Sequence, residues 1–243
     1  MCSLRHWNKF LILLIALVGW SCGRKDPLYR AQQDFEGYPQ YSILLADMKE
    51  EGNFFKDYYH RYKVIYAEKA GEDSVTFKEE LLDWQPVKRE QYEHLEPFLG
   101  MALVSKTPGE DVNDVPQPPG YQYVGDSRYG EWRTDEHGQS FWVFYGRYAL
   151  MRDMLGYGLG GRVYRGEYDD YRGYRRSGRP YYGGQNQYGT GGNVAQKTNP
   201  NFFERRQARD AGRRATFMDR VSKRTKRSNM SSTRRRSSSG FGK

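Results

Sequence analysis

The uneven distribution of charge along the chain restricts its fold more than any other feature. Residues 1–161 carry 18 basic and 24 acidic side chains, whereas residues 162–243 carry 21 basic and 6 acidic ones. Few aliphatic side chains accompany the basic part. Ordering a chain costs about 1 to 2 kcal/mol per residue for the backbone alone, and burial of apolar surface must offset this cost. We therefore expect one packed core before residue 156 and a solvated basic end.

The N-terminus has the anatomy of an export signal. A basic head that includes Arg5 and Lys9 precedes eleven apolar residues, Phe10–Trp20, and the small Ser21 and then Cys22 follow. A membrane-spanning helix needs about 20 apolar residues, so a run of eleven favours a cleaved segment over a permanent span. The sequence therefore predicts a signal peptide over residues 1–21.

The residues Val18–Cys22 (VGWSC) resemble the lipobox of bacterial lipoproteins. The resemblance implies that the Cys22 thiol receives a diacylglyceryl group and its freed amine a further chain such as palmitate. Two or three chains hold a protein on a membrane permanently. Gly23, Arg24 and Lys25 resemble an outer-membrane sorting pattern, which implies the periplasmic face of the outer membrane in the cell envelope. An ordinary secretory signal, which predicts a soluble product, and an uncleaved anchor are the alternatives.

The mature chain divides into four zones by composition. We expect a lipidated tether over 22–37, a small α+β domain over 38–155, a Gly/Tyr/Arg-rich low-complexity segment over 156–196 and a disordered basic tail over 197–243. Disorder is expected to begin near residue 183. The predicted class is therefore a mixed helix and sheet domain with an aromatic-rich hairpin region, followed by a long disordered tail.

Periodicity and turn residues predict the elements of this domain. Apolar residues at helical spacing indicate a helix over 46–60, with Gly52 as a weak point in its middle. Proline-rich residues 107–120 predict a linker-like loop. The other predicted elements are strands 62–66 and 74–78, a helix over 87–99 interrupted by Pro97, a short strand 101–104, a hairpin from 129–133 and 139–145, and a helix over 148–155.

The motifs that resemble catalytic or metal sites are explained by turns, loops and surface or packed residues. Residues 156–161 match G-x-G-x-x-G but follow a helix-like segment, so we interpret them as a helix end and loop. Gly125-Asp126-Ser127 fits a turn. His60, His94 and His137 have no metal-binding spacing, and each is expected at the surface or partly packed. We therefore expect no metal, no cofactor and no catalytic residue, and a binding or scaffolding role in place of an enzyme.

The basic tail is the candidate binding region. Residues 197–243 carry 15 basic and 3 acidic side chains, a net charge of +12. In an envelope the available polyanions are lipid headgroups, acidic polysaccharide and peptidoglycan carboxylates. A merely solvated tail is the alternative. The predicted polyanion-binding residues are Arg205, Arg206, Arg209, Arg213, Arg214, Lys223, Arg224, Lys226, Arg227, Arg234, Arg235 and Arg236.

Two other partners fit parts of the sequence. Tyrosine, arginine and glycine residues from 161 to 192, with the Ser/Arg-rich end, resemble disordered segments of RNA-binding proteins. An exported protein would not meet cellular RNA, so nucleic acid is the second choice. A subunit of an envelope complex is the third, with the aromatic residues of 121–148 as a contact surface. Core packing is the more common role for such residues.

Overall fold

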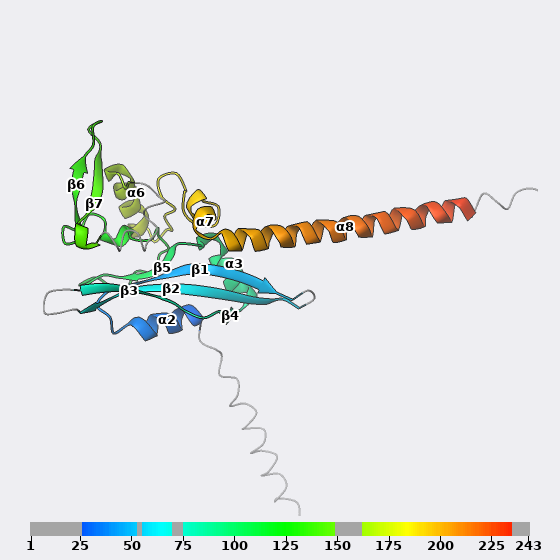
Figure 1. Cartoon of the computed structure of the whole chain (residues 1–243), viewed down its shortest axis with the longest axis horizontal. Coiled ribbons are helices and arrows are strands. Elements are labelled where there is room, and N and C mark those ends of the chain that lie inside the picture. The colour runs from blue at the N-terminus through cyan, green and yellow to red at the C-terminus, as the bar shows by residue number, and fades with distance from the viewer. Residues whose placement is uncertain (1–25, 53–54, 70–74, 149–161, 235–243) are drawn as a thin grey trace, which may run out of the picture.

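A computed structural model describes residues 26–52, 55–69, 75–148 and 162–234. Its centre is an antiparallel sheet with strand order β3-β2-β1-β5, in which β4 pairs with β2. A hairpin of β6 and β7 forms a second sheet (Figure 1). The predicted α+β class is confirmed. The strands are β1 (Tyr41–Glu51), β2 (Asp57–Lys69), β3 (Val75–Leu81), β4 (Gln85–Val87), β5 (Ala102–Lys106), β6 (Gly130–Thr134) and β7 (Ser140–Phe144).

Strand β1 is buried on both of its faces. Tyr41, Ile43 and Leu45 pack in the main apolar cluster, together with residues of helix α2 (Pro27–Phe35). Leu44 joins a second cluster, which contains Tyr123 from the other side of the sheet. Figure 1 shows α2 on one side of the sheet and the β6–β7 hairpin on the other. Two covered faces explain why residues 43–46 of this strand (ILLA) are all apolar and do not alternate with polar residues.

The helix predicted over residues 46–60 is wrong. Residues 46–51 belong to β1 and residues 57–60 to β2, and Met48 lies directly opposite His60 in the antiparallel ladder. Gly52 follows β1 with a φ of +88°, which favours glycine because a Cβ there would collide with the Phe55 carbonyl. Met48 therefore lies on β1 while Tyr58 and Tyr59 lie on β2, and sequence spacing alone did not distinguish these paired strands from one helix.

The expected tether over 22–37 is a helix for part of its length, and this prediction is also corrected. Helix α2 begins after Asp26, whose carboxylate accepts a hydrogen bond from the Leu28 amide at 2.8 Å. Pro27 occupies the first turn, where its missing N–H costs nothing. Ala31 and Phe35 are buried at a spacing of four residues. Capping and this apolar stripe hold the segment on the domain. Residues 22–25 lie outside the described part.

Most other elements of the predicted domain are confirmed. Strands β2, β3 and β5 and the β6–β7 hairpin occupy the expected places. The predicted helix over 87–99 is α3 (Arg89–Leu95), continued by the 3-10 turn η1 (Glu96–Phe98) at Pro97. Residues 107–120 contain no helix or strand and pair with β5 at isolated bridges. Short 3-10 turns are η2 (Tyr121–Tyr123) and η3 (Gly146–Tyr148). Most of the predicted helix over 148–155 lies outside the described residues.

The low-complexity segment packs against the domain, so its predicted irregularity and the domain boundary at 155 are wrong. Tyr171, Tyr181 and Tyr188 are buried around Tyr121. The Tyr171 hydroxyl donates to Gln117 at 2.6 Å. Tyrosine rings thus supply the apolar surface that aliphatic residues usually provide, and the Tyr181 hydroxyl donates to the Glu167 carbonyl at 3.0 Å. The helices of this part are α6 (Arg165–Arg176), α7 (Asn193–Thr198) and α8 (Pro200–Arg234).

Candidate functional site: the C-terminal helix

The start of helix α8 is fixed to the end of strand β1. The Asn199 side-chain amide donates to the Ala46 carbonyl. Phe202 lies in the main apolar cluster and is only 2% exposed. The position of the helix start is therefore fixed by the hydrogen bond from Asn199 to strand β1 and by the buried ring of Phe202. This packing corrects the expectation of disorder from residue 183, because Val194 and Phe202 supply buried apolar surface that the basic composition conceals.

Arginines at four-residue spacing then bind acidic side chains of β1. Arg205 contacts the Asp47 carboxylate at 2.5 Å and donates to the Met48 carbonyl at 3.1 Å. One and two turns later, Arg209 and Arg213 approach the carboxylate of Glu50 at 3.5 and 3.6 Å. Residues four apart share one face of a helix, so this arginine row follows the strand.

The Glu50 carboxylate is the centre of this contact. Besides the two arginines, it accepts a hydrogen bond from the Lys56 Nζ at 2.5 Å, and its side chain is 15% exposed. Partial burial alone would raise its pKa, but the Lys56 hydrogen bond and the three positive charges lower the pKa below its usual value. Glu50 therefore stays ionised and holds the α8 arginines at neutral pH.

One further ion pair joins α8 to helix α3. Arg206 lies 3.3 Å from the carboxylate of Glu96, at the end of α3. Residues 200–213 are therefore held on two sides, by β1 and by α3, and we name them the docked segment. Four of the predicted polyanion-binding residues, Arg205, Arg206, Arg209 and Arg213, lie in this segment. Each of them contacts an acid of the domain, and their role toward a polyanion stays a prediction.

The rest of α8 extends away from the domain (Figure 1). We name residues 214–234 the arm. Every described side chain from 214 to 227 is exposed. Among these residues, the side-chain hydrogen bonds and ion pairs that the structure contains all stay within α8, as in the pair of Lys223 with Asp219 at 2.7 Å. The arm is therefore a helix without a partner in the described chain.

The predicted basic residues of the arm are exposed as expected, except where the structure does not describe them. Arg214, Arg224, Lys226 and Arg227 are exposed, and Lys223 is exposed beside Asp219. The side chain of Arg234 lies outside the described part, as do Arg235, Arg236 and Cys22. The prediction omitted Arg220, which is also exposed. Its position three residues after Phe217 could have identified Arg220 as a further basic residue of this segment.

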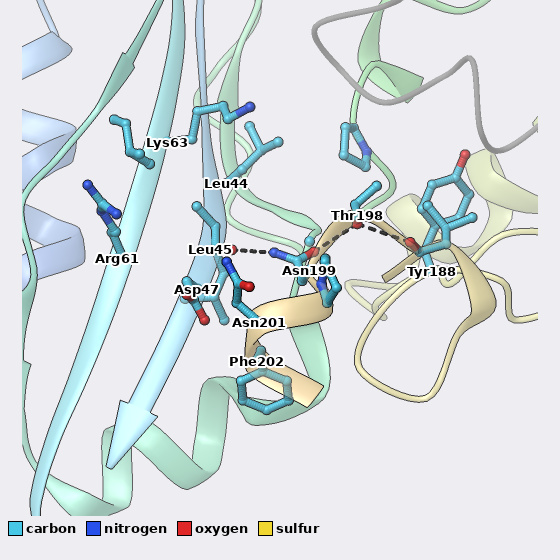
Figure 2. Close-up of a pocket in the computed structure, with 16 residues that line it drawn as sticks. Leu44, Leu45, Asp47, Arg61, Lys63, Tyr188, Thr198, Asn199, Asn201 and Phe202 are labelled. Carbon is cyan, nitrogen blue, oxygen red and sulfur yellow. Dashed lines mark hydrogen bonds between the residues drawn. The ribbon is translucent and has the colours of Figure 1, made fainter. Parts of the chain in front are cut away.

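A pocket of about 310 Å³ lies where α8 begins, between the sheet and the α7–α8 junction (Figure 2). Leu44, Tyr188 and Val194 are among its apolar lining residues. Its polar groups already have partners within the protein: Lys63 lies 3.5 Å from Glu79, and Arg61 donates to the Leu82 carbonyl at 3.2 Å. The Asn199 amide is likewise engaged at Ala46. The pocket thus lies within the junction between α8 and the sheet. Few of its polar side chains lack a partner within the protein.

Of His60, His94 and His137, only His60 differs from its prediction. It is fully buried, its Nδ1 lies 3.0 Å from the Tyr62 hydroxyl, and its ring stacks on Tyr92. Burial lowers the pKa of His60 to about 4, although the charge of Asp26 opposes this shift. His60 is therefore a neutral core residue at pH 7. His94 and His137 are exposed, as predicted.

The remaining predicted motifs do not form a reactive site in the described residues. Gly125-Asp126-Ser127 lies in a turn, as predicted, where the Asp126 carboxylate pairs with Arg128 at 2.6 Å. The glycine motif at 156–161 lies outside the described residues. Within the described ranges, no three His, Cys, Asp or Glu side chains are placed to hold a metal ion. None of the described helices is both long and apolar enough to cross a membrane.

Comparisons with known proteins identify no relative of this chain. No protein-family model, curated protein or solved structure matches this chain.

Proposed function

We propose that this chain is a bacterial envelope lipoprotein, anchored through acylated Cys22, with a binding or scaffolding role. Its arm contacts anionic lipids or anionic polymers of the envelope, such as acidic polysaccharide or peptidoglycan. The lipobox-like residues Val18–Cys22 support the anchor. The observation that carries the binding role is the arm, in which six basic side chains and one acidic side chain between residues 214 and 227 are exposed and have no partner in the described domain.

The division of α8 supports a role for the arm in binding. Arginines whose only task was to hold the helix would end where the acidic partners end, at Glu50. Basic side chains continue for more than three further turns, up to Arg227 and beyond. Close to an anionic surface, each Lys or Arg contributes about 1 kcal/mol of attraction, which salt weakens. A helical arm presents several such charges at once.

RNA binding is the weaker alternative. It depended on tyrosines of residues 161–192 that are free to stack on bases. Tyr171, Tyr181 and Tyr188 are buried in the core. A contact surface on the aromatic region 121–148 is weakened in the same way, because Tyr121, Tyr123 and Tyr129 are buried too. We therefore place the binding role on the arm.

The anchor is tested by mass spectrometry of the mature N-terminus from native membranes. We expect a chain that begins at Cys22 and carries a diacylglyceryl group and an additional acyl chain. A native chain that retains residues 1–21, or one that carries an unmodified Cys22, would contradict the proposed anchor.

The arm is tested with a chain that begins at Gly23, because this chain retains every described element and lacks the acyl groups. Binding to anionic vesicles and to isolated peptidoglycan sacculi is measured at low salt. The test variant replaces six arm residues by glutamine: Arg214, Arg220, Lys223, Arg224, Lys226 and Arg227. The matched control replaces six exposed cations of the domain by glutamine: Lys69, Lys88, Arg89, Arg133, Arg176 and Arg179.

We expect the arm variant to bind at least one of these anionic targets about 100-fold more weakly than the unmodified chain. The control variant should lose much less affinity, although both variants lose six positive charges. Equal losses in the two variants would show a diffuse charge effect, and unchanged binding in the arm variant would remove the arm from the proposed function.

A further inference from the structure

The arm carries exposed apolar side chains that charge attraction does not require. Phe217 and Met218 are each 64% exposed, and Val221 is 41% exposed. At about 100° per residue, positions 217, 218 and 221 fall within an arc of about 100° on the helix. We name these three residues the apolar ridge. The ridge is an exposed apolar strip among the charged residues of the arm.

Charged residues are arranged around this ridge in an amphipathic pattern. Arg214 and Arg224 lie three residues before and seven residues after Phe217, which places both on the side of the ridge. Asp219, the single acid of the arm, lies about 200° around the helix from Phe217, on the opposite side. Long arginine side chains can keep their charge in water while their stems lie along apolar surface. The arm thus combines apolar residues and flanking cations on one face.

The domain does not block this face. Arg209 is at the middle of the row that contacts β1, and Val221 is at the middle of the ridge. The two positions are twelve residues apart, which corresponds to about 120° around a straight helix. Val221 is therefore rotated by about 120° from the arginine row on β1 and by about 60° from Arg206, and it lies beyond the docked segment along the helix. A flat surface can approach the ridge along the arm while the domain remains to one side.

We propose that the arm lies in the interfacial region of an anionic phospholipid bilayer, with the apolar ridge inserted among the acyl chains and its cations at the phosphates. This inference rests on the proposed function and names its target. A hydrated polysaccharide or peptidoglycan offers charge but no apolar interior, so Phe217, Met218 and Val221 would stay in water on such a partner. A bilayer accepts both the ridge and the charges.

Vesicle binding of a ridge variant tests this proposal. The chain from Gly23 carries Phe217→Gln, Met218→Gln and Val221→Gln, because glutamine is polar and retains a high helix propensity. The matched control carries glutamine at three apolar residues exposed on the domain, Phe55, Leu81 and Val112. Affinity for vesicles of equal parts phosphatidylglycerol and phosphatidylcholine is measured by sedimentation.

We expect the ridge variant to bind at least 10-fold more weakly and the control variant to bind within 2-fold of the unmodified chain. Equal affinities of the ridge variant and the unmodified chain would overturn the inserted ridge. If the ridge variant binds normally while the variant that lacks six arm cations does not, the proposed function stands and this inference fails. If neither variant is affected in vesicle binding, this inference fails, and the binding of sacculi by the variant that lacks six arm cations then decides the proposed function.

A fluorescent probe measures insertion directly and separates the bilayer from other anions. Both cysteines precede Gly23, so a chain that begins there has no cysteine and accepts a single label. An environment-sensitive dye on Phe217→Cys should shift its emission to the blue with anionic vesicles and stay unchanged with sacculi. The same dye on Lys226→Cys, about 180° from Phe217 on the helix, should shift much less. Equal shifts at both positions, or none at Phe217→Cys, would contradict insertion of the ridge.

Discussion

The docked segment and the arm belong to one continuous helix of similar composition, yet only the docked segment is part of the folded domain. Residues 200–213 have one buried phenylalanine and four arginines that contact acids. Residues 214–227 have an exposed phenylalanine and exposed cations. The difference arises from Asp47, Glu50 and Glu96, which lie far away in the sequence. Whether an arginine-rich helix packs on the domain or stays exposed therefore depends on the acidic side chains that lie beside it.

The largest test of this comparison uses the two phenylalanines. Phe202→Ala removes a ring that is 2% exposed, and we expect a loss of about 3 to 5 kcal/mol in the free energy of unfolding. Phe217→Ala removes a ring that is 64% exposed and should change this free energy by less than about 0.5 kcal/mol. Urea unfolding of both variants measures the difference. Similar losses would show that the arm also packs against the domain.

Acidification should weaken the domain beneath the docked segment through His60. The pKa of His60 is about 4 when folded, below the unfolded value of 6.5, so protons bind more strongly to the unfolded chain. The free energy of unfolding should therefore fall between pH 6.5 and pH 4, by roughly 3 kcal/mol from this residue. Above pH 7, His60 should not change the free energy of unfolding.

The control for this pH dependence is His60→Gln, compared with the exposed His137→Gln. In urea unfolding from pH 7.5 to pH 4, the stability of the His60→Gln variant should fall less steeply with acid than that of the unmodified chain. The His137→Gln variant should follow the unmodified chain. Parallel curves for His60→Gln and the unmodified chain would show that His60 does not cause this acid sensitivity.

Removal of one carboxylate should loosen the docked segment but not the arm. In Glu50→Gln, Arg209 and Arg213 lose the charge that they contact, and we expect about 1 kcal/mol less stability for the docked segment. Asp219→Asn removes an exposed partner of Lys223 and should cost less than about 0.5 kcal/mol. Cleavage rates by trypsin after Arg209 and Arg213 report the loosening. No increase in the Glu50→Gln variant would argue against the ion-pair contact.

The contact between Glu50 and the α8 arginines should also be lost in acid. The lowered pKa means that its contribution is present at neutral pH and is lost as the pH falls through the folded pKa, below the usual range of about 4 to 5 for Glu. Trypsin is inactive there, so hydrogen exchange of residues 200–213 is the suitable measurement. Exchange should accelerate in this acidic range in the unmodified chain and less so in Glu50→Gln, after correction for intrinsic rates.

The smallest expected effect concerns helix propensity. Ala208 and Ala215 are both exposed within α8, one in the docked segment and one in the arm. Each change to glycine costs about 1 kcal/mol of local helix stability. Ala215→Gly should reduce the far-ultraviolet helix signal without a change in the thermal midpoint, whereas Ala208→Gly should lower the midpoint by a few degrees. A lowered midpoint in Ala215→Gly would show that the arm is coupled to the core.

The sequence predicted the class and most hairpin strands, because alternation and turn residues are local signals. It did not predict β1, since a strand buried on both faces, followed by aromatic residues of the next strand, imitates a helix. It also missed the packing of Tyr171, Tyr181 and Tyr188, because counting aliphatic residues undervalues tyrosine. Residues 197–243 were expected to be disordered, so the sequence did not predict helix α8, and only the fold brings Glu50 beside Arg209 and Arg213.

Hydrogen exchange along α8, measured with and without phosphatidylglycerol vesicles, tests the central distinction most directly. In solution, we expect the amides of residues 200–213 to exchange slowly and those of 214–234 to exchange fast, because tertiary contacts end at Arg213. Vesicles should slow exchange in the arm and leave the docked segment unchanged. Equal protection of both segments in solution, or an arm that exchanges equally fast with and without vesicles, would contradict the account.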